Sequence, residues 1–229
     1  MSRRIIVISA GLSQPSSTRL LADRIAQAVG SQVSARGEQA EIEVVELREL
    51  AMDLATAMTT GGMPTPRLAK VREAVSAADG VIAVTPVFTA SYSGLFKMFF
   101  DVLDTDALNG MPVIAAAAAG TPRHSLVLDH ALRPLFSYLR AVVVPTGVFA
   151  STEDFGDGAA GASLADRIGR AASEFAALVV AEKTGVVGFA PAEIDLKKRN
   201  SGVQVDKAVV PFMSLLKGHT GDGQGKTPA

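Results

Sequence analysis

The sequence predicts a doubly wound α/β fold, in which a five-stranded parallel sheet carries helices on both faces. Two observations lead to this prediction. Short, β-branched apolar runs of strand length alternate with stretches whose apolar residues recur at helical spacing. Most of the runs are also apolar at nearly every position, which is typical of parallel strands buried on both faces. Strands and helices that alternate in this way form a sheet with right-handed crossovers.

Five apolar runs are predicted to form the sheet. Each has the length of a strand, and β-branched residues are frequent in them. The predicted strands are Ile5–Ile8, Ile42–Leu47, Val81–Thr85, Val113–Ala117 and Val142–Val148. The pattern does not reveal the order of these strands within the sheet.

Each predicted strand is followed by a helical stripe, in which apolar residues recur every three or four positions. The stripes are Leu20, Leu21, Ile25 and Val29; Leu68, Val71 and Val75; Leu95, Met98, Phe99 and Val102; Leu126, Leu132, Leu135 and Leu139; and Ile168, Phe175, Leu178 and Val179. Pro134 predicts a kink in the fourth helix, because proline lacks an N–H and clashes with the preceding turn. The segment Met52–Pro66 contains a Gly-Gly pair and two prolines, and we interpret it as a long surface loop.

Composition and charge exclude several classes of protein. With 48% hydrophobic and 20% charged residues, the 229-residue chain has the composition of a globular protein rather than a disordered one. Its net charge of −1 gives no electrostatic reason to expect nucleic acid or an anionic membrane as a partner. No apolar run reaches the roughly 18 residues of a membrane span. The lack of cysteine excludes disulfides and thiolate chemistry, and the three histidines are too scattered for a metal site. We therefore expect a cytoplasmic protein without a bound metal.

One α/β domain is expected over residues 1–183. Beyond Lys183 the helical period is lost, and the chain ends in the Gly-rich, polar stretch GHTGDGQGKTPA. Residues 184–229 are therefore predicted to be an extension that is either mobile or in contact with another subunit.

The loop after the first predicted strand has the composition of a phosphate site. It reads SAGLSQPSSTRLLA, in which several hydroxyls and Arg19 come just before or at the start of a helix. The free N–H groups and the dipole of a helix start favour an anion, and hydroxyls add further donors. Ligands of open parallel sheets also bind beyond the carboxyl ends of the strands. A monophosphate cradle is the favoured interpretation, and a serine N-cap on an ordinary helix is the alternative.

The loops after the third and fourth predicted strands suit a flat, neutral group. The first reads TPVFTASYSG and carries no charge, so that its backbone can line the rim of a planar polar ring while Phe88 or Tyr92 covers the apolar part. The second reads AAAAAGTPRHS, and its small side chains let a ring approach the backbone closely. The alternative for both loops is an ordinary turn between a strand and a helix.

Three stretches carry a resemblance to a known family. ISAGLSQPSSTRLLA, TPVFTASYSGLFKMFFDVL and AAAAGTPRHSLVLDHALRPLF resemble the NADPH-dependent FMN reductases of the flavodoxin-like fold. The resemblance covers roughly Arg3 to Ala181, and the middle stretch is its most specific part. It is greatest to the reductases that supply reduced flavin to two-component monooxygenases.

The resemblance implies a set of FMN-binding residues. The phosphate would be held by Ser13, Ser16, Ser17, Thr18 and Arg19. The isoalloxazine would be bordered by Thr85, Pro86, Val87, Phe88 and Ser91 on one side, and by Ala118, Gly120, Thr121 and His124 on the other. The family's first loop often reads G-S-x-R, whereas this chain has Ala10, Gly11, Leu12 and Ser13 there. Because the usual arginine is missing, we expect FMN to bind weakly, as a substrate that exchanges.

The resemblance also implies an activity. NADPH or NADH would deliver a hydride to N5 of FMN, and the protein would supply alignment and hydrogen bonds rather than a catalytic side chain. A quinone or azo reductase on the same fold is the main alternative. A flavodoxin-type electron carrier is a further alternative, although such carriers are expected to be strongly acidic. The preference between the two nucleotides stays open, and Arg123, Arg140 and Arg167 are all candidates to bind a 2′-phosphate.

The resemblance finally implies partners. A flavin-dependent monooxygenase would take up the reduced FMN. The family usually forms homodimers or homotetramers, and the apolar helix Leu95–Leu103 is a candidate interface. A helix that packs on its own sheet would show the same pattern.

Overall fold

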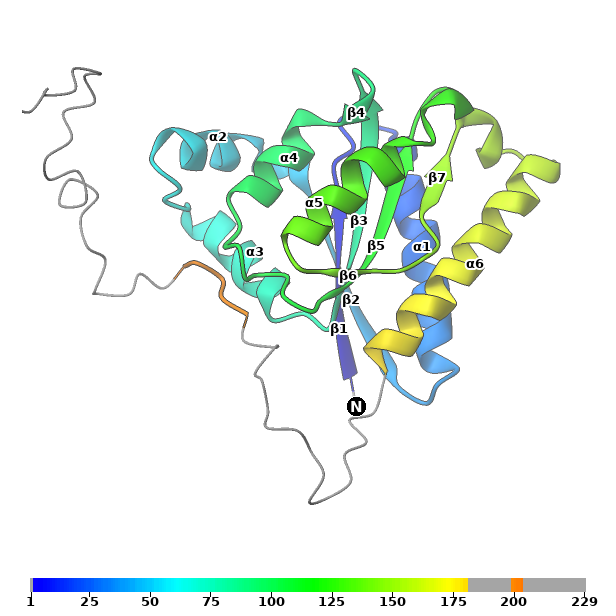
Figure 1. Ribbon diagram of the computed structural model, residues 1–229, viewed down its shortest axis with the longest axis horizontal. Coiled ribbons are helices and arrows are strands. Elements are labelled where there is room, and N and C mark those ends of the chain that lie inside the picture. Colours follow the sequence, from blue (N-terminus) through cyan, green and yellow to red (C-terminus); the bar gives the residue numbers. More distant parts are fainter. Residues whose placement is uncertain (1, 181–198, 204–229) are drawn as a thin grey trace, which may run out of the picture.

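A computed structural model describes residues 2–180 and 199–203. Their strands form one sheet with helices on both faces, which confirms the predicted α/β fold (Figure 1). The strands are β1 (Ser2–Ser9), β2 (Gln39–Glu46), β3 (Gly80–Phe88), β4 (Ser91–Tyr92), β5 (Pro112–Ala118), β6 (Val142–Val143) and β7 (Val148–Ala150).

The main path of the sheet has five positions, in the order β2-β1-β3-β5-β6. All of these strands are parallel, and β4 adds a short antiparallel partner to the end of β3. From β1 the chain moves outward to β2 and then returns to the other side of β1 to form β3. Strand order therefore reverses between β1 and β3, as in flavodoxin-like sheets, and the crevice beyond their carboxyl ends is where such sheets bind ligands.

The prediction of one continuous fifth strand over Val142–Val148 is wrong. The structure instead has β6, which pairs with the start of β5, and β7, which pairs with its end. Residues 144–147 form an irregular connection between them. Pro145 lies in this connection and has no N–H to donate to a neighbouring strand. The N–H of Thr146 donates instead to the carboxylate of Glu174, at 2.8 Å.

Six α-helices and four shorter helical turns connect the strands of the described chain. The α-helices are α1 (Ser17–Ser34), α2 (Ala51–Thr59), α3 (Pro66–Ser76), α4 (Gly94–Asp101), α5 (Arg133–Tyr138) and α6 (Ala159–Val179). The shorter turns are η1 (Leu47–Leu50), η2 (Pro122–His124), η3 (Leu128–Leu132) and η4 (Thr152–Phe155). Within the described ranges, none of the helices combines the length and the apolar character that crossing a membrane requires.

Each face of the sheet has its own hydrophobic core. In β1, Ile5 and Val7 pack with α1 and α6, whereas Ile6 and Ile8 face the side that carries α2 to α5 (Figure 1). All four side chains are buried, as the continuous apolar pattern predicts for a central parallel strand.

The interpretation of Met52–Pro66 as a surface loop is wrong over its first half. Residues 51–59 form α2, and Leu54 and Ala57 bury one side of this helix in the core. The spacing of these two residues fits a helix, and the glycines and prolines that suggested a loop all lie after its end. Only residues 60–65 connect α2 to α3, which begins at Pro66 behind an N-cap, Thr65.

The helix after β5 is irregular next to Pro134. Residues 128–132 form a π-helical turn, η3, and α5 begins at Arg133 directly after it. In a regular α-helix the proline ring would clash with the carbonyl group four residues earlier, and a wider turn relieves this clash. The structure therefore has an irregular winding where the sequence predicts a kink.

The apolar face of α4 packs on the domain itself. Phe96, Phe99 and Phe100 are buried, and the ring of Phe100 packs edge-on against Phe136 of α5, with 5.1 Å between the ring centroids. The pattern over Leu95–Leu103 is thus explained within one chain. An oligomer interface at this helix stays a prediction.

Residues 199–203, called the strap from here on, follow α6 in the sequence and lie against the domain. Arg199 donates from Nε to the carbonyl oxygen of Asn109, at 3.1 Å, and from Nη1 to that of Ala78. Desolvation by burial lowers the pKa of Arg199, although the charge of Asp79 opposes this effect. The predicted boundary at residue 183 and the rest of the extension lie outside the described residues.

Candidate active site

The loops after β1, β3 and β5 leave the sheet side by side at its carboxyl edge. Thr85 of β3 pairs with Ala117 of β5, and the N–H of Ala10 donates to the carbonyl oxygen of Val84, at 3.0 Å. The three sequence stretches that suggested a ligand therefore meet at one edge. This edge lies beside the reversal of strand order between β1 and β3.

The loop after β1, called the phosphate loop (residues 10–16), leads into the N-terminus of α1. Ser16 is the N-cap, and its Oγ accepts a hydrogen bond from the N–H of Arg19, at 3.2 Å. Ser16 therefore acts as an ordinary N-cap, which was the alternative to a phosphate cradle. Ser13 and Ser17 are exposed beside it, and the first turn of this 18-residue helix has no acidic residue. The helix start thus combines free N–H groups, exposed hydroxyls and a first turn without an acidic side chain, which suits an anion.

Close packing shapes the phosphate loop. A Cβ atom on Gly11 would lie only 2.1 Å from the Oγ of Ser16, so any larger residue would disturb the cap. The same atom would lie 3.2 Å from the Cβ of Thr18, whose side chain is buried. The side chain of Thr18 is therefore packed closely against the loop. The tight fit of backbone and hydroxyls in this loop is compatible with a phosphate group.

The guanidinium groups next to the phosphate loop are paired with carboxylates. Arg19 bonds through Nε to Asp23, at 2.8 Å, and through Nη1 to Glu46 at the end of β2. The hydrogen bond to Asp23 is the main reason that the pKa of Arg19 is raised, and Glu46 adds to it. Arg48 also pairs with Glu46, and its Nη1 donates to the carbonyl oxygen of Ser13, at 3.3 Å.

Sequence reasoning missed Arg48. It lies two residues beyond β2, and β2 is the direct neighbour of β1 in the sheet. A known strand order would have placed it beside the phosphate loop. The alternation of strands and helices alone carries no such signal.

The end of β3 and β4 form a tight hairpin, called the β3–β4 hairpin (residues 87–92). Val87 pairs with Tyr92, and Phe88 pairs with Ser91. The two residues at its tip, Thr89 and Ala90, have φ angles of 49° and 64°. Two successive left-handed residues are the pattern of a type I′ turn, which normally carries Asn-Gly. A β-branched residue in this region is strained, and strain of this kind is concentrated at functional sites.

Buried hydroxyls hold the base of the hairpin in place. The Oγ1 of Thr85, with 0% exposure, accepts a hydrogen bond from the N–H of Ser93 at 3.0 Å and donates to the carbonyl oxygen of Pro86 at 2.9 Å. Ser93 in turn caps α4, because its Oγ accepts from the N–H of Phe96 at 3.2 Å. The side chain of Thr85 thus shapes the chain, and only its backbone is available to a ring.

The other predicted ring residues lie around the open side of this edge. Pro86, Val87 and Ser91 are half-buried, and the ring of Phe88 is 46% exposed. Ala118, the last residue of β5, is buried; beyond it, Gly120 and Thr121 are exposed, and His124 is half-buried in η2. No predicted ring residue lies elsewhere. The edge therefore presents backbone, small side chains and one exposed aromatic ring, with no acidic group among them.

A pocket of about 330 Å³ lies between the β3–β4 hairpin and the chain that follows η2. It is lined by Ala90, Ser91, Arg123, His124, Leu126, Val127, His130 and Ala131. The Nε of Arg123 donates to the Nε2 of His124, at 3.2 Å. Because Nε2 accepts this bond, the proton of a neutral His124 ring is assigned to Nδ1.

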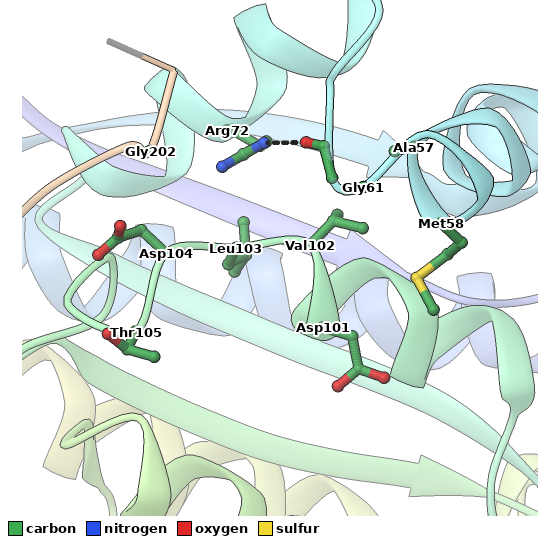
Figure 2. Close-up of a pocket in the computed structure, with 11 residues that line it drawn as sticks. Ala57, Met58, Gly61, Arg72, Asp101, Val102, Leu103, Asp104, Thr105 and Gly202 are labelled. Carbon is green, nitrogen blue, oxygen red and sulfur yellow. Dashed lines mark hydrogen bonds between the residues drawn. The ribbon is translucent and has the colours of Figure 1, made fainter. Parts of the chain in front are cut away.

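A larger pocket, of about 460 Å³, lies away from the carboxyl edge, beside the strap (Figure 2). Arg72 of α3 points into it and is only 4% exposed. Its Nε donates to the carbonyl oxygen of Ser201, at 3.2 Å, and its Nη1 donates to that of Gly62, at 3.4 Å. Burial lowers the pKa of Arg72, against the opposing charge of Asp104. The bond to Ser201 fastens the strap, and Asp101 and Asp104 on the opposite wall make the pocket unsuited to a phosphate.

A comparison with protein families identifies the family of the chain. The family model of the NADPH-dependent FMN reductases matches residues 3–156, which is more than half of the chain. The chain belongs to this family. The matched range contains the three loops that meet at the carboxyl edge, and the resemblance found in the sequence is confirmed.

Individual relatives agree with the family. The chain is 37% identical over 152 residues to an FMN reductase (NADPH) of Pseudomonas aeruginosa, which covers 66% of this chain and 78% of the relative. It is 38% identical over 159 residues to the NADH-dependent FMN reductase SfnF of Pseudomonas fluorescens, covering 69% and 82%. A crystal structure of an oxidoreductase from Corynebacterium diphtheriae shares 63% identity at a TM-score of 0.77, covering 79% of this chain and 98% of that one.

These findings establish the enzyme class. The reductase is an oxidoreductase, and the predicted cofactors, FMN and a nicotinamide nucleotide, are those of its family. Relatives that use NADPH and relatives that use NADH are found at similar identity. Among the described residues, no cluster of His, Asp or Glu could hold a metal ion.

Proposed function

We propose that this reductase transfers a hydride from NADPH or NADH to N5 of FMN and releases the reduced flavin to a partner monooxygenase. The observation that carries the proposal is the meeting of three loops without acidic groups at the reversal of strand order. One of them opens a long helix, and the other two present backbone and small side chains. When bound, FMN supplies the redox chemistry, and the chain supplies binding and alignment.

The residues divide into two groups in this proposal. Ser13, Ser16, Ser17, Thr18 and Arg19 hold the phosphate, Ser16 through its cap geometry. The ring is bordered by Thr85, Pro86, Val87, Phe88 and Ser91, and on its other side by Ala118, Gly120, Thr121 and His124. The neutral hairpin and the small residues at and after the end of β5 border the ring without an acidic side chain.

Release of the flavin follows from the charges at the phosphate loop. Arg19 is held by Asp23 and Glu46, and Arg48 also pairs with Glu46. A phosphate there meets hydroxyls and N–H groups but no unpaired guanidinium, so its binding is expected to be moderate. A flavin that leaves in reduced form needs an acceptor enzyme, and a flavin-dependent monooxygenase is of that kind.

The test measures FMN binding and turnover with two acceptors. FMN is titrated into the purified protein while flavin fluorescence is followed, and the oxidation of NADPH and NADH is measured with free FMN and with a soluble quinone. We expect micromolar FMN binding, rapid exchange with free FMN, and turnover with FMN as the better acceptor. No FMN uptake would overturn the proposal, and much faster turnover of the quinone would favour a quinone reductase.

Two further proposals concern assembly. A homodimer or homotetramer is expected, and light scattering after gel filtration of the full chain measures its mass. The extension beyond residue 183 is proposed to contribute to this assembly, and a variant that ends at Val203 should then contain fewer subunits. An unchanged number of subunits would remove residues 204–229 from the interface.

A further inference from the structure

The pocket between the β3–β4 hairpin and η2 adjoins the proposed ring site. Ser91 and His124 border both spaces, so the pocket begins where the ring site ends. A hydride donor must hold its nicotinamide within about 3.5 Å of the flavin ring. The rest of the dinucleotide then has to leave over the border of the ring site, and this pocket lies directly there. Its volume of about 330 Å³ is in the usual range for a small-molecule site.

The side chains that line this pocket include a positive charge and no negative charge, which favours an anion. Arg123 contributes a guanidinium group, and none of the lining residues is acidic. Asp129, the neighbour of His130 in sequence, is paired with Arg133, at 2.8 Å. Within the described residues, the only hydrogen bond of Arg123 runs from Nε to His124, so both terminal amino groups are available to a ligand.

The pocket at the phosphate loop, of about 290 Å³, has no excess of positive charge. Its two arginines, Arg19 and Arg48, face two carboxylates, Asp23 and Glu46, to which they are bonded. An added phosphate would have to compete with these carboxylates. The comparison favours the pocket at Arg123 for a second phosphate group.

The other two arginines that were candidates for a 2′-phosphate already form hydrogen bonds within the protein. Arg140 pairs with Asp106, at 2.6 Å. Arg167 donates to the carbonyl oxygen of Phe149, at 2.9 Å, and to the Oγ of Ser163, at 3.4 Å. Arg123, in contrast, lines the pocket that adjoins the ring site.

We infer that this pocket receives the adenosine 2′-phosphate of NADPH and that Arg123 makes the reductase prefer NADPH over NADH. A guanidinium group binds a phosphate through two parallel N–H bonds, which gives both strength and orientation. The side chain of Leu126, 61% exposed, provides an apolar wall against which the adenine can pack. The inference rests on the proposed function, because it takes the position of the nicotinamide from the flavin site.

The experiment compares nucleotide binding by three variants of the full chain. Isothermal titration calorimetry with NADP⁺ and with NAD⁺ gives the ratio of their affinities for the wild type, Arg123→Gln, Arg123→Lys and the control Arg140→Gln. The ratio of kcat/KM for NADPH and NADH, measured with FMN, is a second readout that applies where binding is too weak for calorimetry. Arg123 is exposed, so its replacement is not expected to disturb folding.

We expect the wild type to favour the 2′-phosphorylated nucleotide by about tenfold or more, which corresponds to one charge-assisted pair. In Arg123→Gln the ratio should fall to near 1, in Arg123→Lys it should keep an intermediate value, and in Arg140→Gln it should not change. A wild-type ratio near 1, or an unchanged ratio in Arg123→Gln, overturns the inference. The protein could also fail to reduce FMN and still show a preference for NADP⁺ that depends on Arg123. That result would overturn the proposed function but keep the assignment of the pocket.

Discussion

The phosphate loop and the β3–β4 hairpin leave neighbouring strands, but their conformations are held in different ways. In the phosphate loop the contacts that shape the helix start are local, since Ser16 caps the helix that it begins and Gly11 leaves room for that cap. In the hairpin, Thr85 holds Ser93 across eight positions of sequence, and Thr89 at the tip has a left-handed backbone. The first loop follows from the rules of helix starts, whereas the second depends on buried tertiary contacts. A substitution should therefore act on binding in the first loop and on stability in the second.

The largest expected effect is on the buried hydroxyl below the hairpin. Thr85→Val keeps the volume of the side chain but leaves the N–H of Ser93 buried without a partner, which should lower the free energy of unfolding by about 2 kcal/mol. Urea denaturation measures this change. Thr56→Val on the exposed side of α2 is the control and should change it by less than about 0.5 kcal/mol. Equal effects of the two exchanges would show that the hairpin does not depend on this contact.

The next effect concerns the tight packing of the phosphate loop. Gly11→Ala places a methyl group against the Oγ of Ser16, so the cap must rotate away and the donors at the start of α1 are displaced. We expect the dissociation constant of FMN to rise roughly tenfold, as the loss of one such contact implies. Fluorescence quenching measures it, and Gly169→Ala in α6, where an added methyl meets no atom within 4 Å, is the control. Unaltered FMN binding would show that the phosphate site does not depend on the cap geometry of Ser16.

A smaller effect of opposite sign is expected at the tip of the hairpin. Thr89→Asn replaces a β-branched residue by one that tolerates the left-handed region, and should raise the free energy of unfolding by about 1 kcal/mol. The same exchange at Thr56, in helical backbone, should have almost no effect, since asparagine and threonine have similar helix propensities. Denaturation of both variants tests the difference. If Thr89→Asn destabilises the protein, contacts of the threonine side chain outweigh the backbone strain.

The smallest effect concerns the charges beside the phosphate loop. Glu46→Gln removes the carboxylate that Arg19 and Arg48 share, so that Arg48 becomes available to the FMN phosphate while Arg19 stays paired with Asp23. These groups are partly exposed, so we expect only about a twofold gain in FMN affinity, which should diminish as salt is added. Titrations at two ionic strengths measure it. Weaker binding would mean that Glu46 serves mainly to position the two arginines.

The sequence was sufficient for the features that follow from local rules. The parallel strands, the helix stripes and the loop that ends at Ser16 follow from periodicity and capping. Two features were not predicted. The helix α2 was missed because glycines and prolines follow it. The division of the fifth strand depends on Pro145 and on the bond between Thr146 and Glu174. That bond joins residues 28 positions apart.

The site was less accessible to sequence analysis than the fold. The motifs brought the right loops together, but they did not distinguish side chains that face a ligand from those, such as Thr85, that only support the backbone. They also missed Arg48, because its position depends on the strand order. Charge pairing was equally hidden, since Arg19 reaches Glu46 across 27 positions of sequence.

The strap has a consequence for any shortened form of this enzyme. Arg199 binds the carbonyl oxygens of Ala78 and Asn109, and Arg72 binds that of Ser201. Expression of the chain cut after Val180 would remove Arg199 and expose Arg72 to water. Such a fragment would keep all three flavin loops and still be a less stable catalyst, so affinity tags and truncation points belong after residue 203.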